Sequence, residues 1–314
     1  MGVDPQFDSI VTALSQCATR HARRVVDLLM SWCRDYCGNI GASEVRTHLD
    51  RSIGLQIKVE EAAAILQARK SSAAKCIMNR VLIELLKIIP KDSLDQELGM
   101  TLEQNAFNAY RSEKLEDVNQ FPHRKVVSQL QVELLGQLSK TRFLTVSDRF
   151  IRELSKYATN QQPTKEAETK IEHLLKGMRQ LQLKVYPEEE LELSAEFLQS
   201  LSAFFATAHG QSLKIAYAET LSYLLHPVVE TATAEVNHPI WSQAVAVILE
   251  RAIGMVSKAR YWGSAFQLMV IAMGVSPREG FMQQWQGVID VILAKFKVSV
   301  SVHRSGQANA NEGP

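Results

Sequence analysis

Two cysteines one helical turn apart are the residues in this sequence best suited to metal chemistry. Cys33 and Cys37 lie at i and i+4 in an apolar helical pattern, so both thiols can face the same way. A structural zinc site would need two more ligands, and His21 is one candidate. Cys17 and Cys76 also lie on helical patterns, and nothing in the spacing resembles a disulfide ladder. We interpret all four as reduced helix cysteines and expect neither a metal nor another cofactor.

Other polar residues lack the spacing that catalysis requires. His226 and His238 flank one loop without a third ligand near them, which favours a role in structuring that loop. Asp148 and Arg149 share two letters with a kinase catalytic loop but fall inside a helical pattern. We interpret them as charge partners within a helix or between repeats. Because the sequence contains no phosphate-binding glycine loop, H-E-x-x-H or G-x-S-x-G motif, we expect no enzyme activity and no small-molecule substrate.

Composition narrows the class of protein. The chain has 314 residues, 46% hydrophobic and 22% charged, with a net charge of +1, which is ordinary for a soluble protein. A dedicated nucleic-acid binder carries a basic face, and the only hint of one here is the short cluster Arg20, His21, Arg23 and Arg24. The apolar run near 83–89 contains Glu and Lys and is too short to span a bilayer. We therefore expect a cytoplasmic protein that binds no nucleic acid and does not insert into a membrane.

Helical patterns fill the first half of the chain, and no segment alternates convincingly as a strand. Asp4-Pro5 is a typical helix start, and a second pattern ends near Gly38. Ser72–Ile89 is apolar on almost all faces, which predicts a helix buried between neighbours and ended by Pro90. The mostly polar segment Asn39–Leu55 is expected to hold a short helix within 45–49 or to form a mobile loop. Further helices are predicted after Leu98, after Pro122 and from Thr145, where Asp148 completes a Thr-x-x-Asp start.

Four successive helical patterns occupy His209–Phe296 and predict two antiparallel helix pairs. Pro227 should end the first pattern, and Asn237-His238-Pro239 should begin the second. Ser276-Pro277-x-Glu279 reads as a capping box for the fourth, whose apolar stripe includes Phe281 and Trp285. Such pairs stacked without a strict period predict an all-α fold, an α-solenoid of irregular HEAT/armadillo-like antiparallel helix pairs. We expect one repeat domain over 1–298 and a disordered tail over 299–314.

Several collinear segments carry a resemblance to a known family. They are Gln6-Phe7-Asp8-Ser9 with Trp32, Arg69 with Val81–Pro90, Phe143–Phe150, Met178–Pro187, Ala234–Pro239, Arg260-Tyr261-Trp262, and Val275–Arg278 with Phe281 and Trp285. Over about Val3–Lys297 the chain resembles the N-terminal conserved region of the Furry-type cell-morphogenesis proteins, in their fungal branch. Because members of that family are thousands of residues long, we expect this chain to be a fragment or a truncated form.

The resemblance implies a non-catalytic scaffold for an NDR-family kinase and its Mob coactivator in polarised growth and cell morphogenesis. It also implies enrichment at the cell cortex or at sites of polarised growth. The alternative is a generic helical-repeat adaptor or a karyopherin-like transport module, which would bind a Ran-type GTPase or cargo peptides. Arg23, Arg24, Arg260 and Tyr261 are candidate partner-binding residues, because they lie near predicted helix ends and Arg and Tyr are common at binding hot spots. Packing between repeats is the alternative role for each of them.

Overall fold

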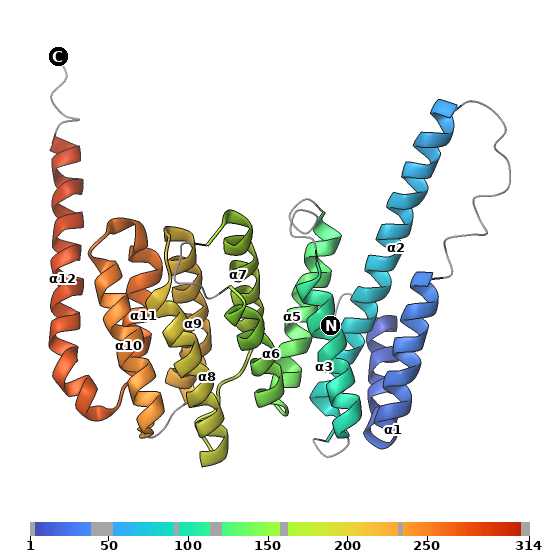
Figure 1. Cartoon of the computed structure of the whole chain (residues 1–314), viewed down its shortest axis with the longest axis horizontal. Helices are drawn as coiled ribbons and strands as arrows, with labels where there is room; N and C mark the ends of the chain where they lie inside the picture. Colours follow the sequence, from blue (N-terminus) through green and yellow to red (C-terminus); the bar gives the residue numbers. More distant parts are fainter. Residues whose placement is uncertain are drawn as a thin grey trace. The chain divides into compact units, whose positions relative to one another are not determined.

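The computed structural model describes residues 4–38, 53–90, 94–113, 121–157, 163–231 and 235–308. Within these ranges it contains eleven α-helices, one short 3-10 helix and no strand (Figure 1), which confirms the predicted all-α helical-repeat class. The chain divides into two compact units, Met1–Arg149 and Phe150–Pro314. The single repeat domain over 1–298 stays a prediction. The helix predicted within 45–49 lies outside the described residues.

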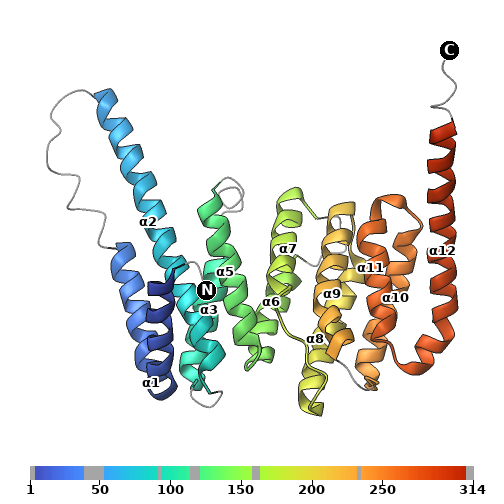
Figure 2. The ribbon, with the colours of Figure 1, turned by 180° about the vertical axis from the view of Figure 1, so that it is seen from behind.

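The first unit is built around one long helix, α2 (Ile53–Ile88). α1 (Pro5–Gly38) and α5 (Pro122–Ser139) both pack on α2, and α3 (Gln96–Arg111) packs on α5. α6 (Phe143–Ser155) follows and contains the boundary between the units. Figure 2 shows these elements from behind. The buried side chains of α2, Val81, Leu82, Ile83 and Leu85, form the centre of this core.

The start of α1 and the break within it agree with the sequence, whereas the exposure of α2 side chains does not. The Asp4 carboxylate accepts hydrogen bonds from the backbone N–H groups of Gln6 and Phe7, at 3.0 and 3.3 Å, so the predicted cap is present. His21 is non-helical (φ −134°, ψ 47°) and separates the two helical patterns expected in this region. Ile77 and Ile88 are exposed, however, so the prediction that α2 is buried on almost all faces is wrong.

The second unit stacks alternate helices. Its elements are α7 (Lys165–Met178), α8 (Glu188–Thr207), α9 (Gln211–Thr231), α10 (Pro239–Val256), η2 (Ala259–Tyr261), α11 (Trp262–Gly274) and α12 (Arg278–Ala308). α9 packs between α7 and α11, whereas α10 packs on α8 and on the neighbouring α11. Equivalent helices of successive pairs therefore lie side by side, as in an α-solenoid. The sequence predicts that α9 pairs with α10, but α9 packs mainly on α7 and α11, and α10 packs mainly on α8 and α11.

Three predicted helix ends are wrong. α9 continues through Pro227 to Thr231, because Val228 is buried and holds the last turn in place. The Ser276 hydroxyl donates to the Ala272 carbonyl of α11, at 2.8 Å, and so does not cap α12. The exposed N–H of Arg278 instead donates to the Glu235 carboxylate, at 2.7 Å. α6 begins at Phe143, and Thr145 uses its hydroxyl elsewhere, as described below.

Two further features concern α10 and the C-terminal helix. α12 extends to Ala308, into the segment 299–314 for which disorder was predicted, and 309–314 lie outside the described residues.

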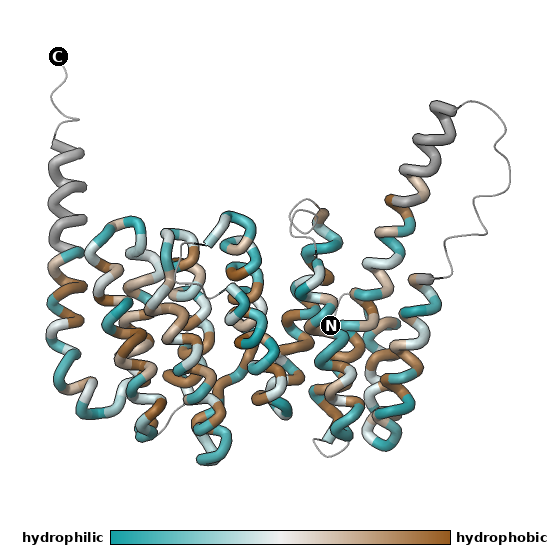
Figure 3. The backbone as a smooth tube through the Cα atoms, in the orientation of Figure 1, coloured by the Kyte–Doolittle hydropathy of each residue, from teal (hydrophilic) through white to brown (hydrophobic). Residues whose placement is uncertain are grey.

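In the described part of the chain, α10 is the one helix long and apolar enough to cross a membrane by length and composition. It is also a core helix, since Trp241, Ile248 and Ala252 are fully buried between its neighbours, and brown apolar segments line it in Figure 3.

Candidate partner-binding surfaces

Arg23 lies within an ion-pair cluster that joins two helices of the first unit. Its guanidinium contacts Asp95 at 3.5 Å and Glu97, both at the start of α3, and lies 4.0 Å from Asp27 on its own helix. The hydrogen bond from Arg23 to Glu97 and the Glu97 charge raise the pKa of Arg23. Arg23 therefore has an intramolecular role, whereas its neighbour Arg24 is exposed on α1 and has no ion-pair partner in the described part of the chain.

The predicted pair Arg260 and Tyr261 belongs to the second unit. Tyr261 is only 4% exposed, so the side chain expected at the surface belongs to the core. The exposed Arg260 places its guanidinium carbon 5.0 Å from the centre of the Tyr261 ring, a cation–π arrangement. Of the four candidates, Arg24 and Arg260 remain available at the surface. The sequence could not distinguish them from their neighbours, because burial at a helix end depends on the adjoining helix.

A second charge cluster surrounds Glu103, a fully buried carboxylate on α3. Its Oε1 accepts hydrogen bonds from Arg142 and, at 2.9 Å, from the Thr145 hydroxyl, while Arg149 Nε lies 3.6 Å from Oε2. Arg149 is therefore a charge partner between helices, as the sequence predicts. Two guanidinium groups and one hydroxyl compensate the buried charge, which makes the cluster a structural link between α3 and α6.

The cysteines expected to be reduced are free, and among the described residues no group of three or more His, Cys, Asp and Glu side chains could hold a metal ion. Burial, together with the adjacent Cys37, raises the pKa of the Cys33 thiol to about 11. Cys37 makes sulfur contacts with Ser71, 3.5 Å from its hydroxyl and 3.9 Å from its carbonyl. Because a nucleophilic or metal-binding cysteine must be a thiolate, Cys33 behaves as an apolar side chain at neutral pH.

Cys33 and Cys37 line a cavity of about 310 Å³ in the first unit, between α1, α2, α3 and α5. The cavity is mostly apolar, with Met30, Met78 and Leu102 in its wall. Sequence patterns gave no sign of this cavity, because its lining residues come from four different helices, α1, α2, α3 and α5. Its volume falls at the lower end of the range typical of ligand pockets.

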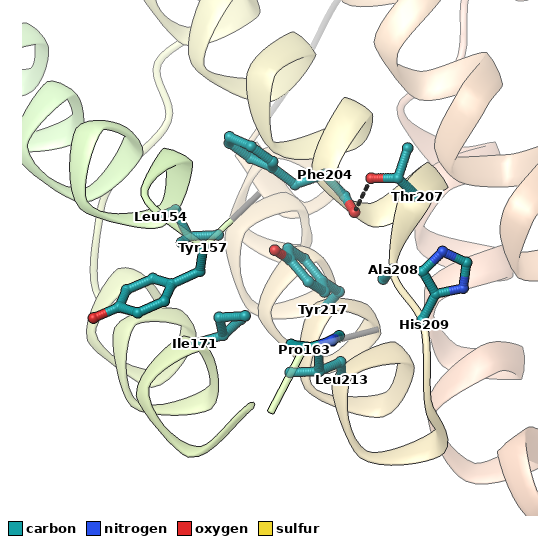
Figure 4. Close-up of a pocket in the computed structure, with 10 residues that line it drawn as sticks. All are labelled: Leu154, Tyr157, Pro163, Ile171, Phe204, Thr207, Ala208, His209, Leu213 and Tyr217. Atoms are coloured by element: carbon teal, nitrogen blue, oxygen red, sulfur yellow. Dashed lines mark hydrogen bonds between the residues drawn. The ribbon is translucent and has the colours of Figure 1, made fainter. Parts of the chain in front are cut away.

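A second, smaller cavity lies in the second unit (Figure 4). It measures about 40 Å³ and is bounded by Leu154 of α6, Ile171 of α7 and the residues around the α8–α9 connection. The Tyr217 ring projects into it, and burial raises the pKa of this phenol above its usual range. A space of this size holds a few water molecules at most, so we interpret it as a packing gap between repeats.

α12 presents an apolar stripe to the surface. Phe281, Trp285, Ile289 and Leu293 follow one another at intervals of four residues, and all are more than one third exposed. The sequence predicts Phe281 and Trp285 to be core residues, whereas Val288 is the buried α12 side chain within 278–295, where burial is described. Exposed apolar stripes of this kind are typical of surfaces that contact other proteins or further repeats.

Comparison with known proteins identifies the family. The sequence profile described as cell morphogenesis N-terminal matches residues 68–305. The chain is 31% identical over 296 residues to the cell polarity protein mor2 of Schizosaccharomyces pombe, covering 94% of this chain and 13% of the relative. It is 35% identical over 247 residues to the cell morphogenesis protein PAG1 of Saccharomyces cerevisiae, covering 79% of this chain and 10% of the relative.

The chain thus spans roughly a tenth of the length of these curated relatives. No solved structure matches it. Both relatives are named for polarity or morphogenesis, and the family profile covers most of the chain, including α3, α5 and all helices of the second unit. The resemblance seen in the sequence is therefore confirmed: the chain belongs to the cell morphogenesis family, of which it carries the N-terminal region.

Proposed function

We propose that this chain is part of a non-catalytic scaffold that binds an NDR-family kinase and its Mob coactivator during polarised growth. The observation that carries the proposal is the collinear match of most of the chain to two proteins named for cell polarity and cell morphogenesis. The kinase and coactivator come from the resemblance to the Furry-type proteins. The same reasoning suggests a cytoplasmic protein enriched at the cell cortex or at sites of polarised growth.

The described surface is compatible with binding proteins. Stacked helix pairs present long faces to a partner. The described residues contain two exposed arginines, Arg24 just after the non-helical His21 of α1 and Arg260 in η2. The buried Glu103 cluster is the nearest approach to an acid–base constellation, and its carboxylate is already committed to Arg142, Thr145 and Arg149. A scaffold role uses the exposed arginines and leaves this cluster to hold the fold together.

A binding experiment separates the scaffold from the alternative of a karyopherin-like adaptor. The purified chain is immobilised and offered, in parallel, an NDR-family kinase with its Mob coactivator and a GTP-loaded Ran-type GTPase. Circular dichroism on the same sample shows that the chain is helical. The scaffold predicts that the kinase–coactivator complex is retained and the GTPase is not. Retention of the GTPase alone would overturn the proposal in favour of the adaptor.

A further inference from the structure

The cavity of the first unit has a floor of buried apolar side chains. Leu82, Leu102 and Leu134, each 2% exposed, come from α2, α3 and α5. Met30 and Met78 stand beside them, and methionine side chains adapt readily to an incoming group. Cys33 contributes a protonated thiol rather than a charge at neutral pH. An occupant must therefore be largely apolar where it enters the cavity.

One polar group in the cavity wall lacks a partner. Gln131 of α5 is 2% exposed, and its side-chain carbonyl oxygen accepts no hydrogen bond in the structure. A buried acceptor without a donor is unfavourable, so a donor that reached this oxygen would gain a hydrogen bond that the chain itself does not supply. The occupant that suits this wall is apolar in its body and carries one N–H or O–H donor. The side chains of tryptophan and tyrosine have that combination.

The outer part of the cavity is basic. Lys75 of α2 is half-buried and Arg34 of α1 is exposed, and both line the cavity. No acidic side chain lines it, and neither cation has an ion-pair partner among the described residues. An acidic residue close to the aromatic side chain would therefore find a complementary charge at the entrance.

We propose that this cavity is a docking site for an amphipathic helix of a partner protein, which inserts a tryptophan or tyrosine and places a carboxylate beside it. The aromatic donor bonds to Gln131, and the carboxylate faces Lys75 and Arg34. A helix satisfies its own backbone hydrogen bonds, so it can lay an apolar face into a groove between helices. This inference rests on the proposed function only in taking the ligand to be a protein.

The test is a selection of peptides against the whole chain. A phage-displayed library of helical peptides is panned on the chain, and selected peptides are synthesised and titrated by fluorescence anisotropy. Enriched sequences are expected to share a tryptophan or tyrosine with an acidic residue within one helical turn. Failure to select any peptide, or selection without this pair, contradicts the proposal. If the chain selects no peptide but binds the anionic dye anilinonaphthalene sulfonate, the cavity is a small-molecule site and the proposal is contradicted.

Three variants locate the binding. Ala109→Phe fills the cavity from a half-buried position, Lys75→Glu reverses the charge at its entrance, and Gln131→Met removes the acceptor while keeping the shape. We expect a loss of affinity of about tenfold or more for the first two and about two- to tenfold for the third. Gln131→Met should leave the melting temperature unchanged or raised, because it removes a buried unpaired oxygen.

Matched substitutions outside the cavity serve as controls. The controls are Ala73→Phe and Lys125→Glu, at exposed positions of α2 and α5. Both should leave peptide affinity unchanged. Equal binding by the wild-type chain and by a folded Ala109→Phe or Lys75→Glu variant would overturn the assignment to this cavity. Because the readout uses selected peptides, it is independent of whether the kinase–coactivator complex binds anywhere on the chain.

Discussion

At the residue scale, Glu103 and the side chains around it constrain the first unit most strongly. The carboxylate is fully buried, and Arg142 reaches it by passing over Gly99 of α3. A Cβ atom added at Gly99 would lie 2.7–2.9 Å from atoms of the Arg142 side chain. The absence of a side chain at position 99 therefore allows Arg142 to approach Glu103.

This geometry predicts a sign reversal in a double-mutant cycle. Gly99→Ala should destabilise the wild-type chain by about 1–3 kcal/mol, because it displaces Arg142 from a buried charge pair. Arg142→Ala alone should cost about 3–5 kcal/mol, because it leaves Glu103 underpaired. In the Arg142→Ala background, Gly99→Ala should instead stabilise by up to about 1 kcal/mol through helix propensity. Urea unfolding of the four proteins measures the cycle, and additive effects would contradict the proposed contact.

The cysteines provide a second prediction. Because the pKa of Cys33 is raised to about 11, its thiol is protonated at pH 8 and should resist alkylation, whereas the exposed Cys17 should react readily. The reaction of Cys33 should accelerate only as the pH approaches 11. Mass spectrometry after brief iodoacetamide treatment at several pH values follows each site separately. Equal labelling of Cys33 and Cys17 at pH 8 would show that the thiol is not held in a buried environment.

At the element scale, the helix cores could be predicted from the sequence and many of the helix ends could not. Periodicity within a helix is local, so the patterns after Leu98 and after Pro122 correspond to α3 and α5. The groups that satisfy helix ends come from far along the chain. Glu235 caps Arg278 from 43 residues away, and Thr145 bonds to Glu103 from 42 residues away. The sequence instead predicts local caps, with Ser276 and Glu279 at the start of α12 and Thr145 and Asp148 at the start of α6.

Pro227 offers the clearest test at this scale. It lies inside α9, where it removes one backbone hydrogen bond, yet the helix continues because Val228 is buried. Pro227→Ala restores the missing N–H on an exposed face and should stabilise the chain by about 1–3 kcal/mol. Thermal and urea unfolding measure the change. If α9 ended at Pro227, as the sequence alone suggests, the same substitution would have little effect on stability.

At the scale of the whole molecule, the sequence was sufficient for the fold class and the family but not for the burial and pairing of the candidate binding residues. Helical periodicity without strands predicts stacked helices, and the collinear segments predict the family that the comparisons identify. Arg23 and Tyr261 were expected at a binding surface. Arg23 is held by acids at the start of α3, and Tyr261 is buried. Both outcomes depend on neighbouring helices, as does the cavity around Gln131.

We propose that this chain itself binds the kinase–coactivator complex, a claim that an equilibrium titration can decide. The labelled chain is titrated with a purified NDR-family kinase and Mob coactivator, alongside Arg24→Glu and the matched variant Lys125→Glu. We expect saturable binding that Arg24→Glu weakens and Lys125→Glu does not, because Arg24 is exposed beside the paired Arg23. No binding by a chain that circular dichroism shows to be helical would contradict the claim.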